Sequence, residues 1–422
     1  MINKLVIAIC FLASLAIHAQ NNTISPYSYF GIGDLRNVAT VENQMMGRLQ
    51  MYSDSIHINL NNPAAYGKLR LTTYSGALSY EKIRMDTYTE EQKTSVTNLQ
   101  YLSIGFPLGD GWGGGFGLMP YSSVGYHLLS DSTNGNGAAV LDEYSGQGGL
   151  NKVYLSLGHR LLKELYLGAT VNFNFGNLTN QRIQSVESVE FGTLDRRESR
   201  INGFDFNYGA TYYPKITDKN TLFTSLTVHT QANLVSENVQ RIGSFSRASG
   251  DEIEVVNVDL AAKGRDRTEV KIPTTTTFGL GYGEEKKWFV GAEYSFQDMS
   301  TFVNEFVDIE DVSYQSASSF GLGIFYIPDY SSFSGYLKRI TYRAGLRMDK
   351  SGMVVRGSEI NNFGITFGMG LPMDNVGFSN LNIGFEIGRK GTTVANLVEE
   401  NYFKVNFGLS LNDRWFLKRR ID

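Results

Sequence analysis

The sequence is nearly free of the features that stabilise many exported or membrane-bound chains. Cys10 is the single cysteine among 422 residues, so the rest of the chain can form no disulfide and no thiolate metal site. Beyond the N-terminus, no run approaches the roughly 18 apolar residues that a transmembrane helix needs. These absences exclude a disulfide scaffold and helical membrane spans.

The chain also has little net charge and few prolines. The chain carries 38 Lys and Arg against 42 Asp and Glu, a net charge of −4, with no basic run. This balance excludes a nucleic-acid partner. Proline numbers 8, whereas glycine numbers 45 and aromatic residues make up 13%. Abundant Gly, Tyr and Phe are typical of outer-membrane barrels, which carry aromatic girdles at both membrane interfaces.

Residues 1–19 have the anatomy of a secretory signal peptide. Lys4 precedes an apolar stretch that closes on "IHA" before Gln20, which predicts cleavage after Ala19. Cys10 lies inside this stretch and not directly after the cleavage site, so no lipid anchor is expected. An exported, cysteine-free chain rich in strand-forming residues predicts the outer membrane of a Gram-negative bacterium.

Apolar and polar residues alternate along many segments. In "YFKVNFGLSLN" (402–412) Phe403, Val405 and Phe407 share one face, and "LYLGATVNFNFG" (165–176) repeats the pattern. A period of two indicates strands, because successive side chains of a strand point to opposite faces. The fourteen expected strands span residues 69–83, 96–108, 112–127, 147–162, 165–181, 199–213, 221–237, 268–283, 287–299, 314–327, 339–349, 353–371, 378–389 and 401–418.

The connections between these strands sort by parity. Compact links such as "GDG" and "LKE" follow the even strands. Long polar segments follow strands 3, 5, 7 and 9, at residues 128–146, 182–198, 238–267 and 300–313. Barrels of the outer membrane have short periplasmic turns at one rim and long external loops at the other. We therefore expect an all-β fold, a 14-stranded antiparallel transmembrane β-barrel over residues 69–422 with both ends in the periplasm.

A soluble β-sandwich or an extracellular adhesin would alternate in the same way and is the alternative. A sandwich rarely uses this many strands of such length. In hydrocarbon, each unpaired backbone N–H or C=O costs several kcal/mol, so a spanning sheet has to close on itself. Closure accounts for all of the expected strands together.

Residues 20–68 do not alternate, yet they contain several apolar side chains. A barrel of this strand number is too wide for its own side chains to fill. We therefore expect residues 20–68 to fold inside the barrel as a hatch, or plug. Pro63 would then fix a turn and Gly67 would allow the bend into the first strand. The alternative is a disordered periplasmic tail.

The stretch "MMGRLQMYSDSIHINLNNPAAYGKL" resembles the hatch of the FadL-type outer-membrane transporters of long-chain fatty acids and other hydrophobic compounds. In that family a "G…A…D…NPA" pattern leads into the first of fourteen strands. The matching positions are Gly47, Asp54, Asn62, Pro63 and Ala64. The chain departs from the pattern after Gly47, where Arg48, Gln50 and Met51 replace small residues.

The two ends of the chain are similar to another branch of this group. The opening "SPYSYFGIGDL" and the ending "LNDRWFLKRRID" resemble poorly characterised outer-membrane proteins related to PorV-like barrels, which serve protein secretion. This resemblance implies a subunit of a larger complex as the alternative to a transporter.

The third expected strand contains an irregular stretch, "GWGGGFGLMPYSSVGYH" (111–127). Pro120 cannot donate to a strand ladder, and the glycines before it weaken pairing, so we expect a bend or gap in the wall. These glycines are Gly113, Gly114, Gly115 and Gly117. The FadL resemblance implies that such a kink is a lateral gate from the lumen to the membrane. The alternative is a bulge that eases barrel curvature.

Six charged residues alternate with the lipid-facing positions. They are Asp205, Glu293, Arg343, Arg347, Glu386 and Lys404. Arg or Lys facing lipid at mid-bilayer would cost several kcal/mol, so we expect all six in the lumen. Their mixed signs favour pairing with each other and with the hatch. The alternative is a polar path for solute or water.

No catalytic motif is recognisable. The histidines beyond the leader, His57, His127, His159 and His229, lack metal-ligand spacing, and no G-x-S-x-G elbow is present. We expect no enzyme, no cofactor and no metal. The expected function is passive movement of hydrophobic, fatty-acid-like small molecules, with that ligand and outer-membrane lipid as partners. The alternative is a non-transporting barrel that docks to other outer-membrane or periplasmic proteins in an assembly or secretion complex.

Overall fold

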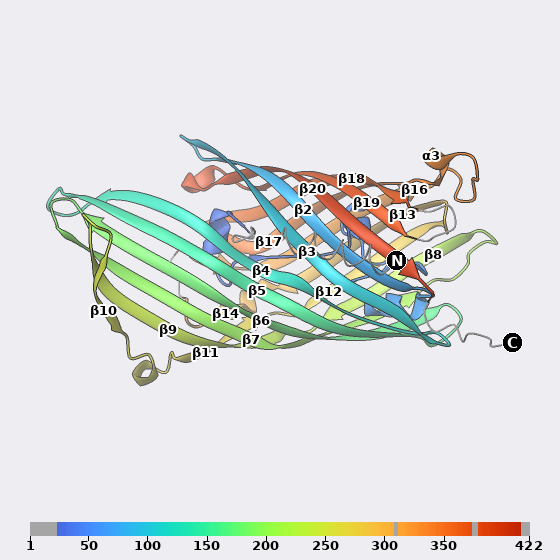
Figure 1. Cartoon of the computed structure of the whole chain (residues 1–422), viewed down its shortest axis with the longest axis horizontal. Helices are drawn as coiled ribbons and strands as arrows, with labels where there is room; N and C mark the ends of the chain where they lie inside the picture. The colour runs from blue at the N-terminus through green and yellow to red at the C-terminus, as the bar shows by residue number, and fades with distance from the viewer. Residues whose placement is uncertain (1–22, 308–310, 374–378, 415–422) are drawn as a thin grey trace, which may run out of the picture.

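A computed structural model describes residues 23–307, 311–373 and 379–414. The expected signal peptide, the first residues of the expected hatch and most of "LNDRWFLKRRID" lie outside these ranges. Figure 1 shows a tilted, elongated β-barrel whose N-terminal segment, drawn in dark blue, lies within it. Among the described residues, no helix is long and apolar enough to cross a bilayer.

Fourteen antiparallel wall strands close into the barrel, because β20 pairs with β2 along the whole length of β2. Four wall strands are interrupted, so their parts carry separate labels: β8 with β9, β11 with β12, β13 with β14 (Val303–Asn304), and β15 with β16. The wall consists of β2 (Thr72–Asp86), β3 (Glu91–Gly109), β4 (Trp112–Thr133), β5 (Ala139–Arg160), β6 (Leu165–Val186), β7 (Phe191–Tyr212), β8 (Asn220–His229), β9 (Ala232–Ser246), β11 (Arg267–Ile272), β12 (Thr275–Glu284), β13 (Trp288–Asp298), β14, β15 (Val312–Tyr314), β16 (Ser316–Tyr326), β17 (Thr341–Val355), β18 (Ser358–Pro372), β19 (Asn380–Gly391) and β20 (Glu399–Asp413).

The two faces of the wall have the opposite polarity to those of a soluble protein. On β18, Ile365 is 51% exposed on the outside, whereas Thr366 next to it is 2% exposed on the inside. On β6, Phe173 is exposed and Asn174 is fully buried. Apolar side chains outside and polar side chains inside are what a lipid-facing barrel requires. This chain is therefore an outer-membrane barrel of a Gram-negative bacterium.

The expected external loops are mostly strand. Residues 128–146 belong largely to β4 and β5, which are joined by a turn at 134–138, and residues 182–198 belong largely to β6 and β7. These strands have 22 residues each, about twice the 9–11 needed to cross a bilayer. The expectation of long loops there is wrong, because polar residues continue the sheet beyond the membrane.

The other two expected loops also contain strand. Residues 238–267 continue β9 and include β10 (Glu252–Asn257), which pairs with β9, and η3 (Ala261–Lys263). Residues 300–313 hold the end of η4 (Met299–Thr301), β14 (Val303–Asn304) and the start of β15. The short turns lie at the opposite, periplasmic rim, where the connection between β16 and β17 carries α3 (Tyr336–Arg339).

The hatch folds as short elements joined by irregular chain. They are η1 (Pro26–Tyr29), β1 (Asp34–Leu35), α2 (Val41–Gln44) and η2 (Pro63–Lys68), and the wall begins three residues later than expected, at Thr72. Met45, Met46 and Leu49 are at most 1% exposed, because they pack against the inner face of the wall. The described part of the hatch is thus an ordered filling of the lumen.

Candidate functional site

The stretch that leaves the hatch packs against glycines of the wall. The Asn62 side chain accepts a hydrogen bond from the Ala64 backbone N–H (3.2 Å), which caps η2, and Pro63 is the first residue of η2. A Cβ at Gly168 would lie 2.3 Å from the Pro63 carbonyl carbon, and one at Gly209 would lie 2.6 Å from Asn62 Oδ1. The Asn-Pro-Ala motif and these wall glycines therefore form one close contact.

Gly47 is the second point where the hatch approaches the wall backbone. Its φ of 65° lies in the left-handed region that favours glycine. A Cβ there would lie 2.5 Å from the Leu346 carbonyl oxygen, and the Gly47 N–H donates to Thr366 Oγ1 at 3.2 Å. Both the backbone conformation and the lack of space require glycine at this position.

Asp54 organises a turn within the hatch. Its Oδ1 accepts from the backbone N–H groups of Ile56 (2.9 Å) and His57 (2.8 Å), and its Oδ2 lies 2.6 Å from His57 Nδ1. Burial acts to raise the pKa of Asp54, but the His57 ring and the two N–H groups outweigh it and hold that pKa well below its usual range. Burial acts to lower the pKa of His57, but Asp54 outweighs it and raises that pKa.

The expected luminal charges lie on the inner face, and two of them contact backbone N–H groups, a side-chain amide and an imidazole. Glu293 of β13 accepts from the backbone N–H groups of Gln50 (2.9 Å) and Met51 (2.5 Å) of the hatch. Asp205 of β7 accepts from Asn172 Nδ2 and lies 2.6 Å from His229 Nε2. Both carboxylates are buried, so these contacts replace the water that they lose.

The other four lie on β17, β19 and β20. Arg347 donates through Nε to Glu386 at 2.8 Å and also pairs with Asp349. Asp349 in turn binds Arg48 of the hatch. Lys404 lies 3.1 Å from Glu81, and Arg343 donates to the amide oxygen of Asn382 at 3.3 Å. The mixed signs of these residues predicted pairing with each other and with the hatch, as Arg347 with Glu386 and Glu293 with Gln50 illustrate, but the sequence did not identify the individual partners.

The barrel wall opens between β3 and β4. Their Cα partners run from Gly109 with Trp112 to Leu102 with Leu118 and stop there. Beyond this point, among the described wall strands, β3 pairs with β2 alone and β4 with β5 alone. Pro120, which has no N–H to donate, lies two residues past the last pair. We call the gap the β3–β4 seam, and Figure 1 shows the β2–β3 hairpin diverging from the β4–β5 hairpin.

The glycines before Pro120 have another role than expected. Gly113, Gly114, Gly115 and Gly117 all have Cα partners on both β3 and β5, so the expectation that they weaken pairing is wrong. A Cβ at Gly113 would lie 1.9 Å from the Tyr66 carbonyl oxygen, and one at Gly115 would lie 2.2 Å from the Tyr66 ring. Gly113 and Gly115 thus leave room for the hatch. The break in the regular pairing of β4 with β5 lies at Pro120, where the register shifts by a bulge.

The hatch replaces β3 along part of the seam. In β1, Asp34 pairs with Ser123 and Leu35 pairs with Ser122 of β4. The Arg36 backbone N–H extends this ladder by donating to the Tyr121 carbonyl oxygen at 2.8 Å. The edge of β4 that β3 leaves unpaired is thereby partly satisfied from inside the lumen.

Polar contacts at the external ends of β19 and β20 fix this part of the hatch. Lys390 Nζ lies 2.7 Å from Asp34 Oδ1. Ser25 Oγ donates to Glu400 (2.5 Å), and Tyr27 Oη donates to the Val398 carbonyl oxygen (2.5 Å). These residues were not identified from the sequence, because contacts between segments more than 350 residues apart leave no local signal.

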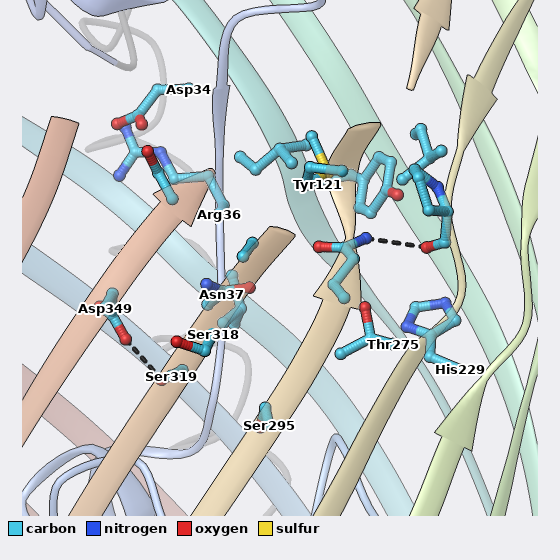
Figure 2. A pocket seen from close by; sticks show the side chains of 18 of the residues that line it. Asp34, Arg36, Asn37, Tyr121, His229, Thr275, Ser295, Ser318, Ser319 and Asp349 are labelled. Atoms are coloured by element: carbon cyan, nitrogen blue, oxygen red, sulfur yellow. Dashed lines mark hydrogen bonds between the residues drawn. The ribbon is translucent and has the colours of Figure 1, made fainter. Parts of the chain in front are cut away.

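A cavity of about 370 Å³ lies between the hatch and the wall, and it reaches Met119, Pro120 and Tyr121. In Figure 2 the hatch chain carrying Asp34, Arg36 and Asn37 crosses this space, with Tyr121 and His229 on one side and Asp349 on the other. A smaller cavity of about 140 Å³ lies toward Val96 and Gln100 of β3. Residues 34–38 line both cavities, so this segment lies between them.

Lys152 is a buried charge in the larger cavity. Its side chain is 6% exposed, and its ammonium lies 4.4 Å from the centre of the Tyr121 ring. It forms no ion pair with a carboxylate of the described residues, whereas the neighbouring Asp205 is occupied by His229 and amides. The lining combines this cation with apolar groups such as Met119 and Ile272. Within the described ranges, no cluster of three His, Cys, Asp or Glu could hold a metal ion.

Several solved structures share this fold. The toluene transporter TodX of Pseudomonas putida is 16% identical, with 92% of this chain and all of TodX covered and a TM-score of 0.58. The toluene transporter TbuX of Ralstonia pickettii is 12% identical, with 92% and 99% covered and a TM-score of 0.56. A FadL homologue of Pseudomonas aeruginosa is 13% identical, with 91% and 100% covered and a TM-score of 0.54. At these identities the likeness establishes the fold.

At the level of sequence, no curated protein matches the chain. A family model named BamG matches residues 1–422, the entire sequence. The chain therefore belongs to the BamG family, built on a barrel fold that it shares with FadL-type channels.

Proposed function

We propose that this barrel lets hydrophobic, fatty-acid-like molecules cross the outer membrane by passive diffusion and leave sideways through the β3–β4 seam. The observation that carries the proposal is β1, which substitutes for β3 against β4 through the pairs Asp34–Ser123 and Leu35–Ser122. Displacing so short a strand would join the luminal cavity to the seam. The role is non-enzymatic, and the toluene transporters with this fold support it.

The ligand would be amphipathic. An apolar tail would lie against Met119 and Ile272, and an anionic end would compensate the buried ammonium of Lys152. In this proposal residues 1–19 are the signal peptide, 20–68 the hatch and 69–422 the barrel. The carboxylates and arginines of the lumen then hold the hatch in place and do not bind ligand.

A disulfide between the hatch and the seam tests the route. Leu35→Cys with Ser122→Cys joins two cross-strand partners in a chain whose single native cysteine, Cys10, lies in the expected signal peptide. We expect the oxidised variant to lose uptake of a radiolabelled fatty acid and the reduced variant to regain it. The matched control is Ser75→Cys with Ser410→Cys, whose hydroxyls lie 3.2 Å apart in the wall. Equal uptake by the oxidised forms of both variants would refute the lateral route.

Pro120→Thr tests the origin of the seam. Threonine restores an N–H at this position, so the β3–β4 ladder can extend past Leu118. We expect reduced uptake at normal barrel yield, measured by heat-modifiable electrophoretic mobility. Unchanged uptake would assign Pro120 to barrel curvature alone.

A second function, docking within an outer-membrane assembly or secretion complex, is favoured by the BamG match, since that name suggests an assembly complex. The departure at Arg48 supports it as well, because Arg48 pairs with Asp349 and ties the hatch to the wall. The PorV-like resemblance of the chain ends points the same way. Gentle detergent extraction with mass analysis separates the two functions: stoichiometric protein indicates docking, and bound fatty acid indicates transport.

A further inference from the structure

The connection between β16 and β17, residues 327–340, holds apolar side chains away from the protein. Phe333 is fully exposed and Leu337 is 69% exposed, while Tyr330 and Tyr336 are exposed to a smaller degree. Singly exposed apolar residues are common on proteins, but this group lies together in one turn at the periplasmic rim. The turn therefore presents a small apolar surface that the chain itself does not cover.

The conformation of the turn is fixed by its own polar groups. Asp329 Oδ1 accepts from the Ser331 backbone N–H at 3.1 Å, and the Asp329 N–H donates to the Lys338 carbonyl oxygen at 2.8 Å. The Gly335 N–H donates to Ser332 Oγ at 3.3 Å. The exposed side chains are consequently displayed by an ordered turn, with the one carboxylate of the turn already engaged.

The position of α3 is continuous with the lipid-facing surface. Tyr342 Oη donates to the Leu337 carbonyl oxygen at 3.2 Å, and Tyr336 Oη donates to the Pro372 carbonyl oxygen at 3.1 Å. Tyr342 faces outward, since its neighbour Arg343 is buried in the lumen. Figure 1 shows α3 at the upper right, near the ends of the neighbouring strands. This helix thus lies where the apolar belt of the wall meets the periplasmic interface.

Cations accompany the aromatic side chains. The Arg339 guanidinium lies 5.6 Å from the centre of the Tyr336 ring, and Lys286 Nζ of the neighbouring turn lies 4.8 Å from that of Tyr330. Lys338 precedes Arg339 in α3. Aromatic rings beside cations suit a membrane interface, where the rings lie at the level of the headgroups and the cations reach lipid phosphates.

We propose that α3 and Phe333 form an interfacial anchor that inserts into the phospholipid of the periplasmic leaflet, with Lys338 and Arg339 at the headgroup phosphates. The anchor rests on the barrel being in a membrane, and it is independent of the proposed transport. Its occupant is lipid because the surface continues the lipid-facing belt of the wall.

Spin labels at introduced cysteines test the insertion. Phe333→Cys and Leu337→Cys would be labelled in the chain lacking residues 1–19 and reconstituted in nanodiscs of phosphatidylethanolamine and phosphatidylglycerol. Asp218→Cys, in the turn between β7 and β8, is the control. We expect labels at 333 and 337 to be reached by oxygen and shielded from a nickel chelate several-fold more than the label at 218. Nickel access equal to that at 218 would overturn the anchor, as would shielding that arises only when outer-membrane proteins are added.

The headgroup contact has its own test. Lys338→Glu with Arg339→Glu keeps the apolar surface and reverses the charge. We expect this double variant to lose much of the nickel shielding at residue 333 in nanodiscs that contain phosphatidylglycerol. Lys163→Glu with Lys219→Glu, in two other periplasmic turns, is the charge-matched control and should keep the shielding. Equal shielding in both double variants would overturn the phosphate contact.

Discussion

Gly168→Ala should loosen the hatch without disturbing the wall. The new Cβ would lie 2.3 Å from the Pro63 carbonyl carbon and 2.5 Å from the Ala64 nitrogen, whereas ordinary contacts begin near 3.4 Å. Because both atoms belong to backbone, no rotamer change relieves the clash, and η2 has to move by about 1 Å. Overpacking of this kind typically costs about 1–3 kcal/mol. A cost of about 1.4 kcal/mol would raise the population of undocked hatch tenfold.

Hydrogen exchange and trypsin report this change. Lys68 at the end of η2 is partly buried and offers a cleavage site that should become accessible in the Gly168→Ala barrel, and amides of residues 62–68 should exchange roughly tenfold faster. The control is Gly135→Ala in the turn between β4 and β5, where a Cβ has no neighbour within 4 Å. Equal protection of residues 62–68 in both variants would show that the close contact with the wall does not hold η2.

Three further predictions concern the polar contacts of the hatch. Glu293→Ala leaves the N–H groups of Gln50 and of the buried Met51 without an acceptor, at about 1–3 kcal/mol for a buried group. It should speed exchange at residues 50–51 more than Glu293→Gln, and equal rates would contradict this. Lys390→Met leaves Asp34 with one ion pair fewer and should speed exchange at residues 34–36, whereas unchanged exchange would show that the backbone ladder alone suffices. The Asp54–His57 contact should stabilise its turn most between about pH 4 and 6.5. The raised pKa of His57 makes this stabilisation decline as pH rises through that pKa, and the lowered pKa of Asp54 makes it decline below about pH 4. Protection of residues 54–57 followed against pH, with His57→Gln as the flat control, checks this.

The alternation of apolar and polar residues in the sequence predicted the barrel. Segments such as 402–412 and 165–176 contain a period of two that persists in β20 and β6, because a lipid-facing wall has to expose every second residue to hydrocarbon. The same rule failed at residues 128–146 and 182–198. In these segments the sheet extends beyond the membrane, so both of its faces can be polar. Without alternation, the sequence pattern of these strands was interpreted as that of loops.

Residues of the site were predictable from the sequence only where a residue type has one clear effect on the backbone. Pro120 marked the end of the β3–β4 ladder because proline cannot donate to a strand neighbour. Gly113 and Gly115 gave a misleading signal, because a glycine that weakens a strand and one that makes room for Tyr66 look alike in sequence.

By itself, the sequence determined an exported, cysteine-free barrel of fourteen strands, an N-terminal segment unlike the wall, and an irregular third strand, since all of these rest on local composition and period. The tertiary structure decided that β1 takes the place of β3 at the seam, that Lys390 holds Asp34, and that Lys152 faces a cavity. Such contacts join segments that lie far apart in the sequence, and they depend on how the closed barrel places these segments in space. No local sequence pattern encodes this placement, so the contacts form only when the barrel closes around its hatch.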